Sequence, residues 1–348
     1  MTNQIVFKVR ANSFIHDQSN PTAFLPFAMS SPFLDNRGDP IPLQQVLGSG
    51  GTAVVLFKNG VAVKTPLRYI WSSDSDVEVN VEVIRREQDV YRRLQSSEDE
   101  RSDGVVRCLG FSTEATQLAY MANGDLEAYL AKYRPSHQLQ LAWFCEVTRT
   151  LGYIHDRRVL VTDIASRNFL LDSDLSLKFC DFSEASLLPL CSNMEVVDDN
   201  GYTTRIDIGL LGKVMYEVVT GNKCEIDLYK DNSSTDGRAY WPERKTLPST
   251  QGIWLGWIIE GCWDGEFRST HSLLRALESV HLRFSSPITQ SRTTHFLVSI
   301  KDCMKSRPIT TIIGVLSVAT FTLFVGRKTF LTPRGFCLCN NFLWPIFI

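Results

Sequence analysis

The chain has 348 residues, of which 36 are basic and 38 acidic. This length suffices for one two-lobed domain with appendages, and the near balance of charge argues against nucleic acid as a partner, because no basic field is available to neutralise phosphates. The nine cysteines form no Cys-x-x-Cys pair and no zinc spacing, which indicates reduced thiols in a cytosolic compartment and not a disulfide framework.

The N-terminal part, residues 1–42, contains five prolines and no sustained periodicity. Such a composition is typical of a loosely ordered extension. The chain does not open on a charged and then apolar signal pattern, so the sequence does not predict secretion.

Two short β-type runs follow at 54–57 and 61–63, and Asn59-Gly60 between them is a strong signal for a hairpin turn. In residues 83–94, apolar side chains recur at helical spacing among charged ones, which predicts an amphipathic helix. A small β-rich half and a larger helical half together predict an α+β, two-lobed fold. The larger half is expected to contain helices at 139–157, 208–220, 253–260 and 272–280.

A glycine-rich stretch, Gly48-Ser49-Gly50-Gly51, precedes the first β-type run. Glycines let the backbone approach phosphates closely and leave N–H groups free to face them, although an ordinary hairpin explains the same residues. Lys64 ends the second run, where its ammonium group can pair with phosphate oxygens as a point charge. A surface lysine at a strand end is the alternative interpretation of that residue.

Three polar residues carry the strongest chemical signal. Asp163 is followed five residues later by Asn168, and Asp181 stands in Asp-Phe-Ser after the next stretch. In a phosphoryl-transfer site one aspartate faces the incoming hydroxyl, an asparagine holds a metal, and a second aspartate holds Mg²⁺ against the ATP phosphates. The spacing of these three residues has that layout.

Together these segments resemble the eukaryotic protein kinase domain over residues 43–280. The stretch from Gly48 to Val55 resembles the glycine loop of that family, and Val-Ala-Val-Lys64 resembles its third-strand lysine motif. The resemblance implies an N-lobe at about 43–118 and a C-lobe at about 123–280. It also implies ATP and Mg²⁺ as cofactors and transfer of the γ-phosphate of ATP to the hydroxyl of an unidentified protein substrate.

The resemblance assigns expected roles to individual residues. Glu87 would pair with Lys64, and Asp163 would orient the substrate hydroxyl and accept its proton. The catalytic set is Asp163, Lys64, Glu87 and Arg167; the nucleotide set is Gly48, Gly50, Gly51, Val55, Ala62, Lys64, Ala119 and Met121; the metal set is Asn168 and Asp181.

The acceptor type stays open at this point. Arg167 resembles the tyrosine-kinase form of the catalytic loop, and Ala165 stands where Ser/Thr kinases place a lysine. Leu118 would gate the back of the adenine pocket, next to the hinge groups of Ala119 and Met121.

The resemblance also predicts three supporting features. Asp207 would hydrogen-bond the backbone of the catalytic loop, and Arg268 would pair with Glu195, which lies twelve residues before Asp207. A hydrophobic spine that aligns the lobes would comprise Tyr91, Leu109, Val161 and Phe182.

The chain departs from the family pattern at Ala53, Ser183 and Thr162. Thr162 replaces an arginine that receives an activation-loop phosphate, so we predict activity that does not depend on phosphorylation of that loop. Glu195 follows Asp181 by only fourteen positions, which is short for the peptide-binding activation segment. These departures keep two alternatives open: a nucleotide-binding pseudokinase scaffold that acts through protein partners, and a small-molecule phosphotransferase.

The C-terminal part comprises a linker at 281–308, an uncharged stretch at 309–325 and an apolar tail at 326–348. Seventeen uncharged residues lie at the short limit for crossing a bilayer. The stretch predicts either membrane association through a transmembrane helix or a packed terminal helix, and a misassigned end of the coding sequence is the third interpretation. Because ATP is cytosolic, an anchored form would keep the kinase domain in the cytoplasm.

Overall fold

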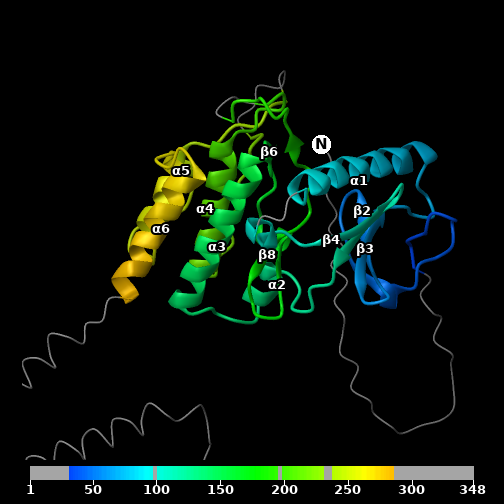
Figure 1. Cartoon of the computed structure of the whole chain (residues 1–348), viewed down its shortest axis with the longest axis horizontal. Helices are drawn as coiled ribbons and strands as arrows, with labels where there is room; N and C mark the ends of the chain where they lie inside the picture. Colours follow the sequence, from blue (N-terminus) through cyan, green and yellow to red (C-terminus); the bar gives the residue numbers. More distant parts are fainter. Residues whose placement is uncertain (1–30, 97–99, 195–197, 231–236, 286–348) are drawn as a thin grey trace, which may run out of the picture. The chain divides into compact units, whose positions relative to one another are not determined.

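A computed structural model describes residues 31–96, 100–194, 198–230 and 237–285. The chain divides into two compact units, 1–283 and 284–348. The described part of the first unit has a β-rich N-terminal lobe followed by a helical C-terminal lobe, as Figure 1 shows. The predicted α+β, two-lobed fold is therefore confirmed.

The N-terminal lobe is a five-stranded antiparallel sheet with the strand order β1-β2-β3-β5-β4. Asn59 and Gly60 form the predicted hairpin turn, and both have positive φ (52° and 82°), which suits the right-handed twist of the two strands they connect. This turn sets the register that places Lys64 opposite Val55. The strands are β1 (Val46–Ser49), β2 (Ala53–Lys58), β3 (Val61–Pro66), β4 (Cys108–Ser112) and β5 (Ala115–Ala119).

One long helix, α1 (Asp74–Leu94), packs against β3 and β5 of this sheet (Figure 1). It begins well before the predicted start at residue 83, because Ser73 and Asp76 form a reciprocal capping box at its N-terminus. No side chain is buried before Val83, so the first half of the helix lacks the apolar periodicity from which the second half was predicted.

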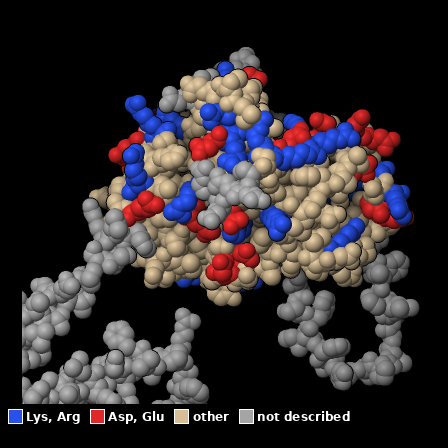
Figure 2. All heavy atoms as spheres, in the orientation of Figure 1, with Lys and Arg blue, Asp and Glu red and all other residues tan. Residues whose placement is uncertain are grey.

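The charges of α1 follow its dipole. Figure 2 shows acidic side chains at one end of the helix and basic side chains along the rest of it, in agreement with Asp74 and Asp76 in the first turn and Arg92 and Arg93 in the last. These charges of the first and last turns lie at the helix ends whose dipoles stabilise them.

The C-terminal lobe is built on α3 and α4, which pack against one another and against the large hydrophobic core. Ser136 caps the N-terminus of α3 and Thr203 that of α4, while Gly221 ends α4 at φ 73°. Its helices are α2 (Leu126–Leu130), α3 (His137–Asp156), α4 (Thr204–Thr220), α5 (Gly256–Asp264) and α6 (Thr270–Ser285), and its strands are β6 (Val159–Leu160), β7 (Phe169–Leu171), β8 (Leu177–Phe179) and β9 (Ser186–Leu187).

The chain packs against the N-terminal lobe before the boundary expected at residue 43. Phe33 and Ile41 are buried with Val54 and Leu56 on one face of the sheet, and Phe33 forms a β-bridge with Tyr69. Residues 32–40 form bends, turns and isolated bridges, so their sequence shows neither helical nor strand periodicity.

None of the helices within the described ranges is long and apolar enough to cross a bilayer. The stretch 309–325, in which a membrane helix was one interpretation, lies outside the described residues. Glu195, the expected partner of Arg268, also lies outside them, so that ion pair stays a prediction.

Candidate active site

The ammonium group of Lys64 joins two carboxylates that are far apart in the sequence. Its Nζ lies 2.9 Å from Glu87 Oε1 and 2.8 Å from Asp181 Oδ1. Strand β3 delivers the lysine and α1 delivers the glutamate, whose Oε1 also accepts a hydrogen bond from the N–H of Phe182 at 2.9 Å. The expected pairing of Lys64 with Glu87 is therefore present, and it extends to the segment after β8.

Burial makes this cluster electrostatically tight. Lys64 is 5% exposed and Glu87 is fully buried. Desolvation would lower the pKa of Lys64, but the charges of Glu87 and Asp181 raise it well above its ordinary value. Desolvation would likewise raise the pKa of Asp181, yet the Lys64 charge and hydrogen bonds lower it to about 2. Lys64 and Asp181 are thus held in their charged forms at neutral pH.

Asp163 lies on the loop between β6 and a single 3₁₀ turn, Ser166–Asn168. Both of its carboxylate oxygens accept from Arg167 Nη2, at 2.7 and 2.6 Å. Asn168 Nδ2 donates to the carbonyl and to Oδ2 of Asp163, each at 2.9 Å. The side chain of Asp163 is 36% exposed, so it is oriented by these two neighbours while still facing solvent.

A buried carboxylate on α4, Asp207, fixes the backbone of the loop that leads to Asp163. Asp207 accepts the N–H groups of Val161 at 2.9 Å and of Thr162 at 2.8 Å, as expected, and it also bonds His155 Nε2 at 2.8 Å. Thr162 adopts a left-handed backbone conformation, with φ 64°. Anchoring both N–H groups offsets the strain of that conformation for a β-branched residue.

Thr162 also contacts the segment that follows Asp181. Its hydroxyl donates to the carbonyl oxygen of Glu184 at 2.7 Å. The residue that replaces the phosphate-receiving arginine therefore connects the catalytic loop to that segment through a neutral hydrogen bond.

The segment around Asp181 is strained at one residue. Asp181 itself has φ 61°, whereas Ser183 does not, so a serine in place of the family glycine meets no left-handed backbone there. Ser183 donates to Asp181 Oδ1 through its hydroxyl at 2.7 Å and through its N–H at 3.3 Å. The N–H of Cys180 donates to the carbonyl of Asn168 at 3.0 Å. This bond joins the residue before β7 to the residues after β8, so it keeps the two expected metal ligands, Asn168 and Asp181, near one another.

The residues expected at the nucleotide lie along one side of the N-terminal sheet. Ala62 and Leu118 are buried and pair across β3 and β5. The N–H of Ala119 donates to the carbonyl of Arg107 at 2.8 Å, which fixes the backbone at the end of β5. Val55 and Met121 are half-buried, and both pack against the main core.

The glycine stretch comprises the exposed end of β1, where Gly48 pairs with Val55, and the turn at Gly50 and Gly51 that leads to β2. At Gly48, Gly50 and Gly51 an added Cβ would meet nothing within 4 Å, and none of the three has positive φ. Neither the backbone nor the packing of this structure thus requires glycine at these positions.

One prediction about the hydrophobic spine is wrong. Leu109 is 47% exposed on β4, whereas its neighbour Cys108 packs against the main core. Side chains alternate along a strand, so an error of one residue moves the assignment to the opposite face. The other three spine residues are buried, and the rings of Tyr91 and Phe182 meet edge to face at 5.3 Å.

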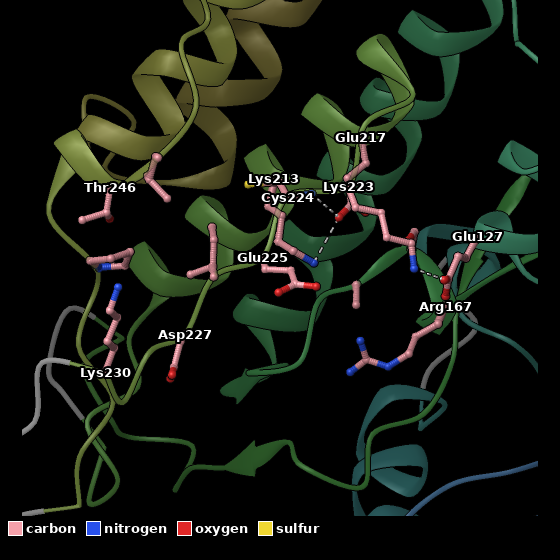
Figure 3. A pocket seen from close by; sticks show the side chains of 15 residues that line it. Glu127, Arg167, Lys213, Glu217, Lys223, Cys224, Glu225, Asp227, Lys230 and Thr246 are labelled. Atoms are coloured by element: carbon pink, nitrogen blue, oxygen red, sulfur yellow. Dashed lines mark hydrogen bonds and ion pairs between the residues drawn. The ribbon is translucent and has the colours of Figure 1, made fainter. Parts of the chain in front are cut away.

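A cavity of about 600 Å³ opens beside the catalytic loop, with Arg167 at its edge. Figure 3 shows that two ion pairs line it, Lys213 with Glu217 at 3.4 Å and Lys223 with Glu127 at 2.5 Å. Its lining holds four basic and four acidic side chains, so its charge does not favour either sign in a ligand.

Sequence reasoning missed several residues that hold the site. His155 and Ser183 bond the side chains of Asp207 and Asp181, and Asp198 accepts from Ser186 Oγ at 2.5 Å and from the N–H of Tyr202 at 2.7 Å. Most of these contacts join segments that are distant in the sequence, so no local sequence motif predicts them. No group of three or more His, Cys, Asp or Glu residues within the described ranges could hold a metal ion by itself.

A family model described as the protein kinase domain matches residues 42–240, more than half of the chain. Among curated relatives, the serine/threonine/tyrosine-protein kinase HT1 of Arabidopsis thaliana is 27% identical over 42% of this chain and 41% of its own length. A probable receptor-like protein kinase of the same plant is 29% identical over 51% of this chain and 40% of its own length. The cytoplasmic tyrosine-protein kinase BMX of Mus musculus is 26% identical over 72% of this chain and 41% of its own length. The chain thus spans about two fifths of the length of these relatives.

Proposed function

The chain belongs to the protein kinase family, and on this premise we propose that it transfers the γ-phosphate of ATP to a hydroxyl group of a protein substrate. The observation that carries the proposal is the convergence of Lys64, Glu87 and Asp181, with distances of 2.8–2.9 Å between the ammonium and the carboxylates. Glu87 keeps Lys64 at the end of β3, where its charge can meet the phosphates of a bound nucleotide.

We assign the catalytic role to Asp163. Arg167 and Asn168 fix its carboxylate, and the remaining exposure of that side chain allows an acceptor hydroxyl to approach. A carboxylate within hydrogen-bond reach of a hydroxyl orients it and accepts its proton as the phosphoryl group transfers. Relatives of both acceptor classes match the chain, so serine or threonine and tyrosine both remain candidate acceptors.

The residues of the site fit a magnesium ion. Mg²⁺ prefers hard oxygen ligands and binds through one or two carboxylates together with substrate phosphates, so a site without a complete protein cage is consistent with it. Asp181 is 43% exposed and receives Lys64 and Ser183 at Oδ1, and the amide nitrogen of Asn168 is used by Asp163. We propose that the carboxylate of Asp181 and the amide oxygen of Asn168 hold the ion, which would neutralise phosphate charge when bound.

The nucleotide base would lie between Ala62, Val55 and the hinge, where the carbonyl of Ala119 and the backbone of Met121 supply hydrogen-bonding groups. Gly48, Gly50 and Gly51 would cover the phosphates. Since ATP is available in the cytosol, we also propose that this domain works in the cytoplasm. Membrane association through residues 309–325 stays a prediction.

Binding and transfer must be measured together to test this proposal. Mg·ATP binding is followed by thermal shift, and transfer of labelled phosphate is followed on generic protein acceptors and on small molecules. Asp163→Asn should bind Mg·ATP as the wild type does and should lose transfer by about 10²–10⁴-fold, the usual contribution of a positioned acid or base. Transfer that is unaffected by this substitution would contradict the role of Asp163.

One observation favours the scaffold alternative. Ser183 bonds Asp181 through both its hydroxyl and its N–H, so a ligand for the metal is shared with a residue that the family pattern leaves as glycine. A scaffold would bind Mg·ATP without turnover in the wild type. Turnover on small molecules alone would instead favour the third interpretation, a small-molecule phosphotransferase.

A further inference from the structure

The backbone of a single residue in the segment after Asp181 contacts both lobes. The N–H of Leu188 donates to the carbonyl of Arg158 at 2.9 Å, and the carbonyl of Leu188 accepts from Arg93 Nη1 at 2.5 Å. Arg158 immediately precedes β6, and Arg93 lies in the last turn of α1. Leu188 therefore connects the strand that leads into the catalytic loop with the helix that carries Glu87.

The C-terminal lobe fixes the position of Leu188 independently of α1. Strand β9 pairs with β6, which places Ser186 opposite Leu160, and Ser186 donates its hydroxyl to Asp198 Oδ2 at 2.5 Å. The hydroxyl of Thr162 holds the carbonyl of Glu184 earlier in the same segment. The carbonyl of Leu188 is thus a fixed acceptor to which α1 can attach.

Arg93 stands on the side of α1 that faces this segment. Arg86 lies seven residues earlier, hence on the same side of the helix. Burial and the charges of Asp163 and Asp181 raise the pKa of the Glu184 carboxyl, and the charge of Arg86 opposes this rise. Both arginines therefore act on the segment after Asp181, and Arg93 makes the direct contact.

Arg92, by contrast, points to another side of α1. It pairs with Asp89 at 2.5 Å, and its guanidinium lies over the ring of Phe111 at 4.7 Å. The helix therefore offers a matched control: two adjacent arginines in its last turn, of which only Arg93 reaches Leu188.

We propose that Arg93 is a positioning residue that holds α1 in the orientation in which Glu87 meets Lys64, by donating to the carbonyl of Leu188. Glu87 lies six residues before Arg93, about 9 Å along one rigid helix at 1.5 Å per residue. A charge-assisted hydrogen bond at the end of the helix limits its rotation away from the C-terminal lobe. The contact involves no phosphate, so it can align the site in an unmodified chain. The consequence for catalysis rests on the proposed function.

The first test compares Arg93→Met, Arg93→Lys and Arg92→Met in the full chain. Loss of a charge-assisted hydrogen bond should lower kcat for phosphate transfer by about tenfold or more in Arg93→Met. The KM for the acceptor should stay near that of the wild type, because the proposed role of Arg93 is to position α1 and not to bind the acceptor. Arg93→Lys retains a cationic donor and should recover most of the activity, and Arg92→Met should stay within about twofold of the wild type.

The second test does not require activity. Hydrogen exchange at the amides of residues 83–90 should be faster in Arg93→Met than in the wild type and Arg92→Met, because the helix is released from Leu188. A wild type that transfers no phosphate would refute the proposed function, and exchange would then decide the role of Arg93. Unchanged exchange in Arg93→Met, or equal effects of the two methionine variants, would overturn the proposal.

Discussion

Lys64 illustrates how much one buried side chain can determine at the scale of the residue. Its ammonium group compensates the charge of Glu87, which is fully buried, and reaches Asp181 at the same time. The sequence predicted the pairing of Lys64 with Glu87 through the family motif, since both residues lie in elements with strong local signals. It did not predict that Glu87 also accepts the N–H of Phe182, because backbone partners leave no trace in a sequence.

Removing Lys64 should reveal the cost of that buried carboxylate. Lys64→Met removes the countercharge of the buried Glu87 carboxyl, so the free energy of unfolding should fall by about 3–5 kcal/mol. Adding Glu87→Gln removes the charge and keeps an acceptor for Phe182, so the double variant should regain most of the loss. Urea unfolding measures both. Equal midpoints for the single and double variants would show that the burial of Glu87 costs little.

Asp181 should make the stability of the protein depend on pH only under acidic conditions. Its pKa is lowered to about 2 in the folded protein, mainly by Lys64, against an ordinary value of 3.8. A lowered pKa means that the stabilisation is fully present above the pKa of the unfolded state and is lost as the pH falls from about 4 toward 2. The difference in unfolding free energy between the wild type and Asp181→Asn should therefore be constant from pH 8 to pH 5 and should shrink below pH 4. A difference that declines between pH 7 and 6 would assign the titration to another group.

At the scale of the element, the anchoring of the catalytic loop by α4 is the most sensitive feature. Asp207 is fully buried and accepts the N–H groups of Val161 and Thr162. Asp207→Ala should lower the free energy of unfolding by about 2–6 kcal/mol, since each of two buried N–H groups left unpaired costs about 1–3 kcal/mol. Asp207→Asn keeps one acceptor oxygen and should cost less. Denaturant unfolding of both variants checks this order, and an alanine variant as stable as the asparagine variant would contradict it.

Gly50, in the turn between β1 and β2, allows a test that separates binding from folding. An added Cβ at Gly50 meets open space and a permitted backbone. Gly50→Ala should therefore leave the unfolding free energy of the free protein within about 0.5 kcal/mol of the wild type, as for other surface changes. If phosphates approach this backbone, the affinity for Mg·ATP should nevertheless fall. Calorimetric titration measures it, and unchanged affinity would support the ordinary-hairpin interpretation.

The elements differ in how well the sequence predicts them. The hairpin at Asn59-Gly60 and the buried second half of α1 have strong local signals and are where they were expected. The exposed first half of α1 depends on a cap instead of apolar periodicity. The assignment of Leu109 to the spine was wrong because the sequence of a strand does not show which of its two faces is buried. Contacts such as Thr162 with Glu184 arise only when distant segments meet.

At the scale of the whole molecule, hydrogen bonds that involve no phosphate align the segment after Asp181. Thr162 holds the carbonyl of Glu184, and Ser186 bonds Asp198. Phosphatase treatment of the purified protein should therefore leave its transfer activity within about twofold. Loss of activity through dephosphorylation of residues 182–194 would show that a modification supplies the alignment.

The central claim is that Lys64, Asp181 and Asn168 surround one nucleotide and its metal between the lobes. The dependence of ATP affinity on Mg²⁺, measured by calorimetric titration without any acceptor, tests this claim directly. Mg²⁺ should strengthen ATP binding in the wild type and in Asp163→Asn, and this gain should be lost in Asp181→Asn, which removes the charged ligand. The same gain in all three proteins, or no ATP binding in the wild type, would contradict the account.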